Sequence, residues 1–88
     1  AAFPVSGEIN LTLADTARAL ATLQDRYGPE ALAFSDIDGV SFEFASWRLN
    51  VRSSNTEPVM RVNVETRGDE ALMREKTDEV LALLEGSQ

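Results

Sequence analysis

Three stretches in the middle of the chain alternate apolar and polar residues, and this alternation constrains the fold more than any other feature. Residues 40–51, VSFEFASWRLNV, place an apolar side chain at every second position on both sides of Ala45 and Ser46, the expected tight turn. Residues 59–65, VMRVNVE, repeat the pattern. Successive side chains of a strand point to opposite faces of a sheet, so each stretch predicts a strand with one apolar and one polar face.

The residues before these strands predict one more strand and a helix. Residues 7–13, GEINLTL, alternate in the same way. Asp15 stands where a helix N-cap is expected, because its carboxylate can accept hydrogen bonds from the first free amides. Apolar residues then continue at helical spacing as far as Tyr27. Gly28 and Pro29 are expected to end this helix, since glycine accepts a positive φ and proline cannot continue the ladder.

A second helix is expected at the end of the chain. Gly68 and Asp69 open it, Gly86 closes it, and its apolar residues lie along one stripe. The predicted order is therefore β-α-β-β-β-α. Consecutive strands with short turns pair antiparallel, and two amphipathic helices cover one face of their sheet. We expect an α+β two-layer sandwich of about four strands, similar to TATA-box-binding domains, with residues 1–88 as a single domain.

The polar face of the predicted sheet gathers charged and amide side chains. Strand alternation places three residues of each central strand on this face: Arg48, Asn50 and Arg52, and then Arg61, Asn63 and Glu65. Arg52 and Arg61 are expected to lie near the loop that joins the two strands, although the pattern does not give their register. Two neighbouring guanidinium groups repel each other, so an anion between them would favour the pair.

The loop between Arg52 and Arg61 has the chemistry of an anion site. Ser53, Ser54 and Thr56 offer hydroxyl donors. Asn55 tolerates the left-handed conformation, which turns successive amides toward one point and forms an anion-binding nest. Arginine adds a planar fork that matches phosphate oxygens. The same residue types are also common in ordinary turns, so a plain hairpin loop with two solvated arginines remains an alternative at this point.

Composition excludes several other classes of site. The 88 residues contain no cysteine and no histidine, which removes thiolate chemistry, the usual general base and the commonest metal ligand. The net charge of −7 repels phosphate backbones and anionic lipid, so we expect neither nucleic-acid nor membrane partners. The chain begins at Ala1 rather than methionine, and we expect a piece of a longer polypeptide.

The segment RSSNTEP, residues 52–58, resembles the phosphate-binding loop in the C-terminal domain of the α-D-phosphohexomutases. The family pattern is Arg-x-Ser-(Asn or Gly)-Thr-Glu-Pro, followed by an arginine on the next strand, here Arg61. The resemblance extends over nearly the whole chain: SGEIN precedes the first helix, DGV precedes the hairpin, and WRLNVR and RVNVE flank the loop. Asn55 makes the loop most similar to the phosphomannomutase/phosphoglucomutase branch.

The resemblance implies the C-terminal, phosphate-binding domain of a four-domain mutase. Such an enzyme interconverts hexose 1-phosphate and 6-phosphate through a phosphoserine and a bisphosphorylated sugar, with Mg²⁺ bound in another domain. The last domain grips the phosphate that is not transferred and rotates to close the cleft. The implied partners are a mannose or glucose phosphate and the remaining domains, and the implied location is cytoplasmic. This chain carries neither the family's serine motif nor its metal loop, so we expect no cofactor and no activity in the fragment alone.

The resemblance also assigns roles within the loop. Arg52 is expected to bind the phosphate oxygens, and Ser54 and Thr56 to donate their hydroxyls. The amides of Asn55 and Thr56 complete the cradle, while Arg61 acts either directly or through a neighbouring group. Glu57 and Pro58 are interpreted as structural.

Other interpretations remain open. One is a phosphoglucosamine mutase domain, which more often has glycine in place of Asn55. A protein-interaction module and a small-molecule regulatory domain are two further alternatives, and a DNA-binding sheet conflicts with the acidic charge. Asp36 and Asp38 are interpreted as a turn rather than a metal site, and Ser6, Gly7 and Glu8 as a structural segment of the first strand.

Overall fold

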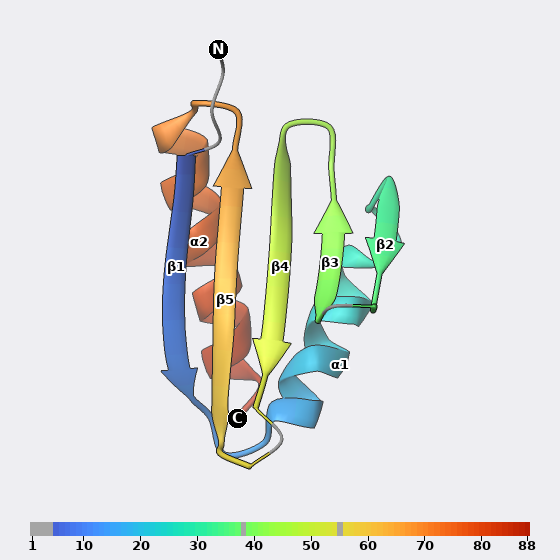
Figure 1. Ribbon diagram of the computed structural model, residues 1–88, viewed down its shortest axis with the longest axis vertical. Coiled ribbons are helices and arrows are strands. Elements are labelled where there is room, and N and C mark those ends of the chain that lie inside the picture. The colour runs from blue at the N-terminus through green and yellow to red at the C-terminus, as the bar shows by residue number, and fades with distance from the viewer. Residues whose placement is uncertain (1–4, 38, 55) are drawn as a thin grey trace.

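One antiparallel sheet spans the molecule, and both helices lie against the same face of it (Figure 1). The computed structural model describes residues 5–37, 39–54 and 56–88. Its elements are β1 (Val5–Thr12), α1 (Thr16–Tyr27), β2 (Ala33–Ser35), β3 (Val40–Glu43), β4 (Trp47–Ser53), β5 (Val59–Thr66) and α2 (Glu70–Gly86). The strand order is β1-β5-β4-β3-β2, and every neighbouring pair is antiparallel. The predicted α+β two-layer sandwich is confirmed.

The sheet has five strands rather than about four. The additional strand, β2, consists of three exposed residues that pair with β3 at the edge of the sheet. Its sequence, AFS, shows no apolar alternation because neither of its faces is buried, and so the pattern that predicted the other strands was absent. A very short edge strand of this kind also limits pairing with other chains.

The core lies between the helices and the face of the sheet that they cover. The apolar residues predicted for β4 and β5 are buried, and α1 and α2 contribute the opposing layer. The buried apolar residues are Leu13, Ala19, Leu23, Tyr27, Phe42, Trp47, Leu49, Val51, Met60, Val62, Val64, Val80 and Leu84. Full burial of such a side chain stabilises the fold by roughly 1.5–3 kcal/mol. This packing fixes the strand parity, because a one-residue slip would move the whole apolar set to the solvent face.

Both helices begin at aspartate N-caps, as the sequence predicts for Asp15. The Asp15 carboxylate accepts a hydrogen bond from the Arg18 amide at 3.0 Å, and Asp69 accepts one from the Leu72 amide at 2.9 Å. Helix α1 ends at Tyr27 as expected, but Gly28 has φ −52° and does not adopt the left-handed conformation. The expected mechanism of termination was therefore wrong at Gly28, and Pro29 is left as the residue that cannot extend the ladder.

Within the described residues, neither helix combines the length and apolar character needed to cross a bilayer.

Candidate phosphate-binding site

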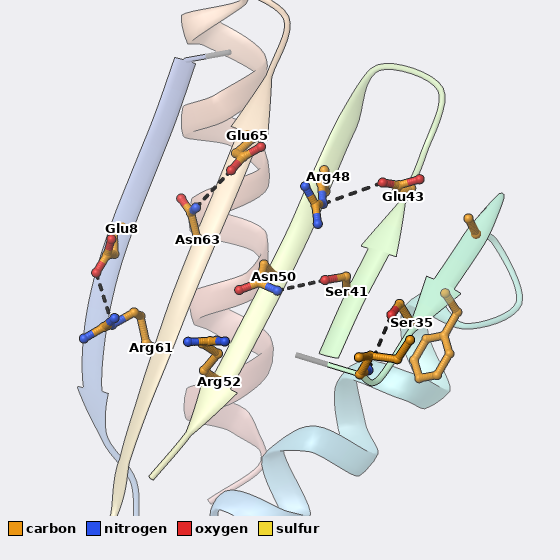
Figure 2. Close-up of a pocket in the computed structure, with 13 residues that line it drawn as sticks. Glu8, Ser35, Ser41, Glu43, Arg48, Asn50, Arg52, Arg61, Asn63 and Glu65 are labelled. Atoms are coloured by element: carbon orange, nitrogen blue, oxygen red, sulfur yellow. Dashed lines mark hydrogen bonds and ion pairs between the residues drawn. The ribbon is translucent and has the colours of Figure 1, made fainter. Parts of the chain in front are cut away.

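The face of the sheet opposite the helices, here called the open face, carries polar side chains from all five strands (Figure 2). Along β4 the side chains of Trp47, Leu49 and Val51 are buried, and those between them lie on the open face. A shallow hollow of about 510 Å³ extends across this face. Its lining includes Arg48, Asn50 and Arg52 from β4, Arg61, Asn63 and Glu65 from β5, and Glu8 from β1. The predicted parity of both central strands is confirmed.

Arg52 and Arg61 are direct partners across β4 and β5. The register pairs their Cα atoms, with Asn50 opposite Asn63 two residues further from the loop. Both arginine side chains are exposed and both line the hollow. Directly opposite residues on one face have Cβ atoms about 5 Å apart, and like charges at that spacing repel. The structure therefore supplies the register that the sequence pattern left open, and it places the Cα atoms of the two arginines opposite each other next to the hairpin loop.

The guanidinium group of Arg61 is oriented by β1. Its Nε lies 3.1 Å from Glu8 Oε1, and it also donates a hydrogen bond of 3.4 Å to Asn10 Oδ1. Both Arg61 and Glu8 are about half exposed, so this ion pair is weak in water. The acid that pairs with Arg61 is thus Glu8. Figure 2 shows this pair on the β1 side of β5, while Arg52 lies on the opposite side, over β4.

The sequence interpretation does not include the contact between Glu8 and Arg61. The pattern of β1 predicts only that Glu8 faces solvent, not which strand lies beside it. The pairing of β1 with β5, which places Asn10 opposite Arg61, joins segments about fifty residues apart. Alternation within one strand carries no information on such long-range pairing.

The loop after β4 is organised by the hydroxyl group of Ser54. Ser54 Oγ accepts hydrogen bonds from the amides of Thr56 and Glu57, both at 3.2 Å. The Ser54 amide donates to the Val59 carbonyl at 3.1 Å and closes the hairpin. Two successive amides therefore converge on one oxygen atom, in the way that a nest converges on an oxyanion.

The geometry of Ser54 favours its hydroxyl as a donor. A serine hydroxyl has one hydrogen to donate and two lone pairs to accept with, and the two amides occupy both lone pairs. Thr56 Oγ1 lies 3.4 Å away, at a long hydrogen-bond distance. The Thr56 amide, which we expected in the cradle, donates to Ser54, so a phosphate would have to exchange with that bond. Asn55, the other expected amide donor, lies outside the described residues.

A second hollow, of about 400 Å³, lies at the loop end of the sheet. Arg52, Arg61, Ser53 and Ser54 line it, together with Gly39 before β3. The structure therefore brings together four of the five predicted site residues near one end of the hairpin: two arginines on the strands, and Ser54 and Thr56 on the loop. Such an arrangement has the donors and charge to bind an anion, but it contains no nucleophile paired with a base.

No group of three or more Asp, Glu, His or Cys side chains in residues 5–37, 39–54 and 56–88 is placed to hold a metal ion. Asp38, one of the two acids interpreted as a turn, is not among these residues.

Comparison with known proteins adds a second, independent observation. Residues 8–82 match the family model described as "Phosphoglucomutase/phosphomannomutase, C-terminal domain". The chain belongs to this family. The match runs from Glu8 in β1 through most of α2 and includes β4, β5 and the loop between them.

Curated relatives carry the same family name. A phosphomannomutase of Escherichia coli is 55% identical over 84 residues, and one of Salmonella montevideo is 56% identical over 84 residues. A protein of Xanthomonas campestris pv. campestris named "Phosphohexose mutases" is 49% identical over 84 residues. These alignments cover 96% of this chain but only 18–19% of each relative. The domain thus spans less than a fifth of the length of the relatives that it matches.

Proposed function

We propose that this domain binds the non-transferred phosphate group of a phosphorylated hexose as the C-terminal part of a phosphomannomutase/phosphoglucomutase. The parent enzyme interconverts hexose 1-phosphate and hexose 6-phosphate through an enzyme phosphoserine and a bisphosphorylated sugar. The names of the relatives support this branch over a phosphoglucosamine mutase. The remaining domains of the same polypeptide supply the transferred phosphoryl group and the contacts to the sugar.

The observation that carries the proposal is the direct pairing of Arg52 with Arg61 beside the Ser54 loop. Like charges directly opposite each other on one face of a sheet repel, and the ion pair with Glu8 offsets this only in part at Arg61 because both groups are about half exposed. A phosphate dianion removes their repulsion and accepts charge-assisted hydrogen bonds from both, each about twice as strong as a neutral one. The Ser54 hydroxyl, which accepts from two amides, retains its hydrogen as a donor for the same anion.

The role of this domain in the reaction is to hold and position substrate. A phosphate fixed at one end of the sugar converts an encounter into an oriented complex, and closure of the domain over the cleft excludes water from the transferring group. Mg²⁺ would supply electrostatic stabilisation of the transferring phosphoryl group from elsewhere in the parent enzyme. The Mg²⁺ requirement and the cytoplasmic location both remain predictions for that enzyme.

A titration of amide chemical shifts with glucose 1,6-bisphosphate tests the proposal. We expect the shifts to concentrate in residues 53–57 and on the side-chain signals of Arg52. Glucose serves as the matched control, because it offers the same ring without the phosphates. Shifts confined to the helices, or equal shifts with glucose and the bisphosphate, would contradict the proposal.

A further inference from the structure

Gly39, the residue before β3, lies directly against the side chain of Arg52. Its φ angle is 75°, in the left-handed region, and the next residue, Val40, pairs with Val51. A Cβ atom at position 39 would lie 2.7 Å from Arg52 Cγ and 2.8 Å from the carbonyl oxygen of Val51. Real Cβ atoms essentially never approach other atoms within 3.0 Å. Any side chain at this position would therefore displace Arg52, the β4 backbone, or both.

The same Cβ atom would lie 3.5 Å from Arg52 Nε, so the aliphatic stem of Arg52 runs past the glycine as far as the start of its guanidinium group. Gly39, Arg52 and Ser54 also line the hollow of about 400 Å³ at the loop end of the sheet. A side chain at position 39 would act on the site in two ways. It would displace the aliphatic stem of Arg52, and it would make the hollow smaller.

We propose that Gly39 is a positioning residue for phosphate binding: its missing side chain leaves the space that the Arg52 stem occupies, and so determines where the guanidinium group meets the ligand. This inference rests on the proposed function and extends it beyond the loop. Arginine has several rotatable bonds, and an unrestrained side chain would lose more entropy on binding. Contact along the stem reduces that loss before the ligand arrives.

A second glycine separates this role from a simple need for positive φ. Gly68 has φ 78°, nearly the same value, but nothing lies within 4 Å of a Cβ atom built there. Gly68→Ala and Gly39→Ala therefore share the strain of placing an L-residue at positive φ. Gly39→Ala in addition brings its Cβ atom against Arg52 Cγ and the Val51 carbonyl oxygen, and the double-mutant cycle described below separates these two contacts.

The experiment compares both variants with the unmodified chain in titrations with inorganic phosphate, after circular dichroism has shown that each is folded. We expect Gly39→Ala to weaken phosphate binding roughly tenfold, the effect of displacing one charge-assisted contact, and to shift the Arg52 Nε–H signal. Gly68→Ala should change neither the phosphate affinity nor the Arg52 Nε–H signal. Equal phosphate affinities in the two alanine variants would overturn the inference.

A double-mutant cycle tests whether the effect passes through Arg52. In an Arg52→Ala background there is no Cγ atom for a side chain at position 39 to meet, so Gly39→Ala should cost little further affinity. An equal loss in both backgrounds would show that Gly39 acts independently of Arg52, and would overturn the inference. If Gly39→Ala does not fold, Gly39→Asn replaces it, because asparagine tolerates positive φ while keeping the Cβ contact.

Failure of the proposed function has a different signature. If Arg52→Ala alone leaves phosphate affinity unchanged, Arg52 is not a ligand-binding residue, and the role of Gly39 falls with it. If Arg52→Ala weakens binding but Gly39→Ala matches Gly68→Ala, the phosphate site stands and only the positioning role is wrong.

Discussion

At the scale of single residues, the capacity of each arginine to bind an anion depends on which groups already contact its side chain. Arg61 is held by Glu8 and Asn10 on β1, whereas the stem of Arg52 lies against Gly39 on the opposite side. Arg48, four residues from Arg52 on the same face, lies 3.7 Å from Glu43. Arg48 is about 13 Å from Arg52 along the strand. The three arginines of the open face therefore differ in environment although the sequence pattern treats them alike.

Arg52→Ala in a complete mutase that carries this domain is expected to raise KM and to lower kcat/KM by roughly 10²-fold, on the order of 2–3 kcal/mol. The reason is the loss of a charge-assisted contact to the phosphate. Steady-state kinetics with mannose 1-phosphate measures it. Arg48→Ala is the matched control, since it removes the same charge from the same face away from the loop. Wild-type kinetics for Arg52→Ala, or an equal loss for Arg48→Ala, would rule out the assigned role.

Glu8→Gln is expected to tighten phosphate binding about two- to fivefold, because it removes a negative charge that neutralises Arg61. Titration with inorganic phosphate at low salt measures the change. Glu65→Gln is the control: it makes the same change in net charge on the open face, four residues from Arg61. Tighter binding in both variants would mean that net charge alone is responsible, and weaker binding in Glu8→Gln would mean that Glu8 orients Arg61 for the ligand.

At the scale of secondary-structure elements, a hydrogen bond between the helices stabilises the layer behind the site. The Tyr27 hydroxyl of α1 donates to Glu79 Oε2 of α2 at 2.6 Å, and Lys76 lies 3.4 Å from the same oxygen. The hydrogen bond from Tyr27 is the main cause that lowers the pKa of Glu79. The positive charges of Lys76 and Arg26 lower it further, whereas partial burial acts in the opposite direction and raises it. Burial and the same bond raise the pKa of the Tyr27 phenol. The ionised carboxylate is therefore favoured in the folded state.

Tyr27→Phe should lower the free energy of unfolding by about 1–2 kcal/mol at pH 7. A carboxyl group whose pKa is lowered on folding stabilises the fold above its unfolded pKa, and this contribution is lost as pH falls through the folded value. The difference between wild type and Tyr27→Phe should therefore narrow in acid. Urea unfolding of both proteins at pH 7 and at a pH below the folded pKa of Glu79 measures this difference. Glu30→Gln, which breaks only the exposed pair with Arg26, should change stability little at either pH, and a constant Tyr27→Phe difference would contradict the linkage.

Most elements could be predicted from the sequence because a helix or strand with one buried face has apolar residues at a regular spacing. The strands with one buried face and both aspartate-capped helices were identified, and so were the parity and the loop that carry the site. The strand β2 was missed because its residues are exposed on both faces. The register of Arg52 with Arg61 and the contact between Glu8 and Arg61 depend on pairing between strands, which no single segment specifies.

At the scale of the whole molecule, the net charge affects where an anion can bind. Fifteen acidic residues against eight basic ones give a net charge of −7. A dianion approaching such a molecule is repelled except where cations cluster, and two of the eight cations, Arg52 and Arg61, are paired at the loop. The negative surface therefore disfavours the binding of anions except where such cations lie together.

The 88-residue chain alone is expected to show no mutase activity and to bind glucose 1,6-bisphosphate with a Kd on the order of millimolar. Its site is open to solvent and contributes donors from one side only, while relatives of the full length are about five times longer. Water competes with the ligand for each of these contacts. The open side of the described site adds no contacts that would offset the entropy lost when the ligand is fixed. A coupled mutase assay and the amide-shift titration measure the two quantities. Turnover by the isolated chain, or micromolar affinity, would show that the described site is more complete than its geometry indicates and that the remaining domains are not needed to hold the ligand.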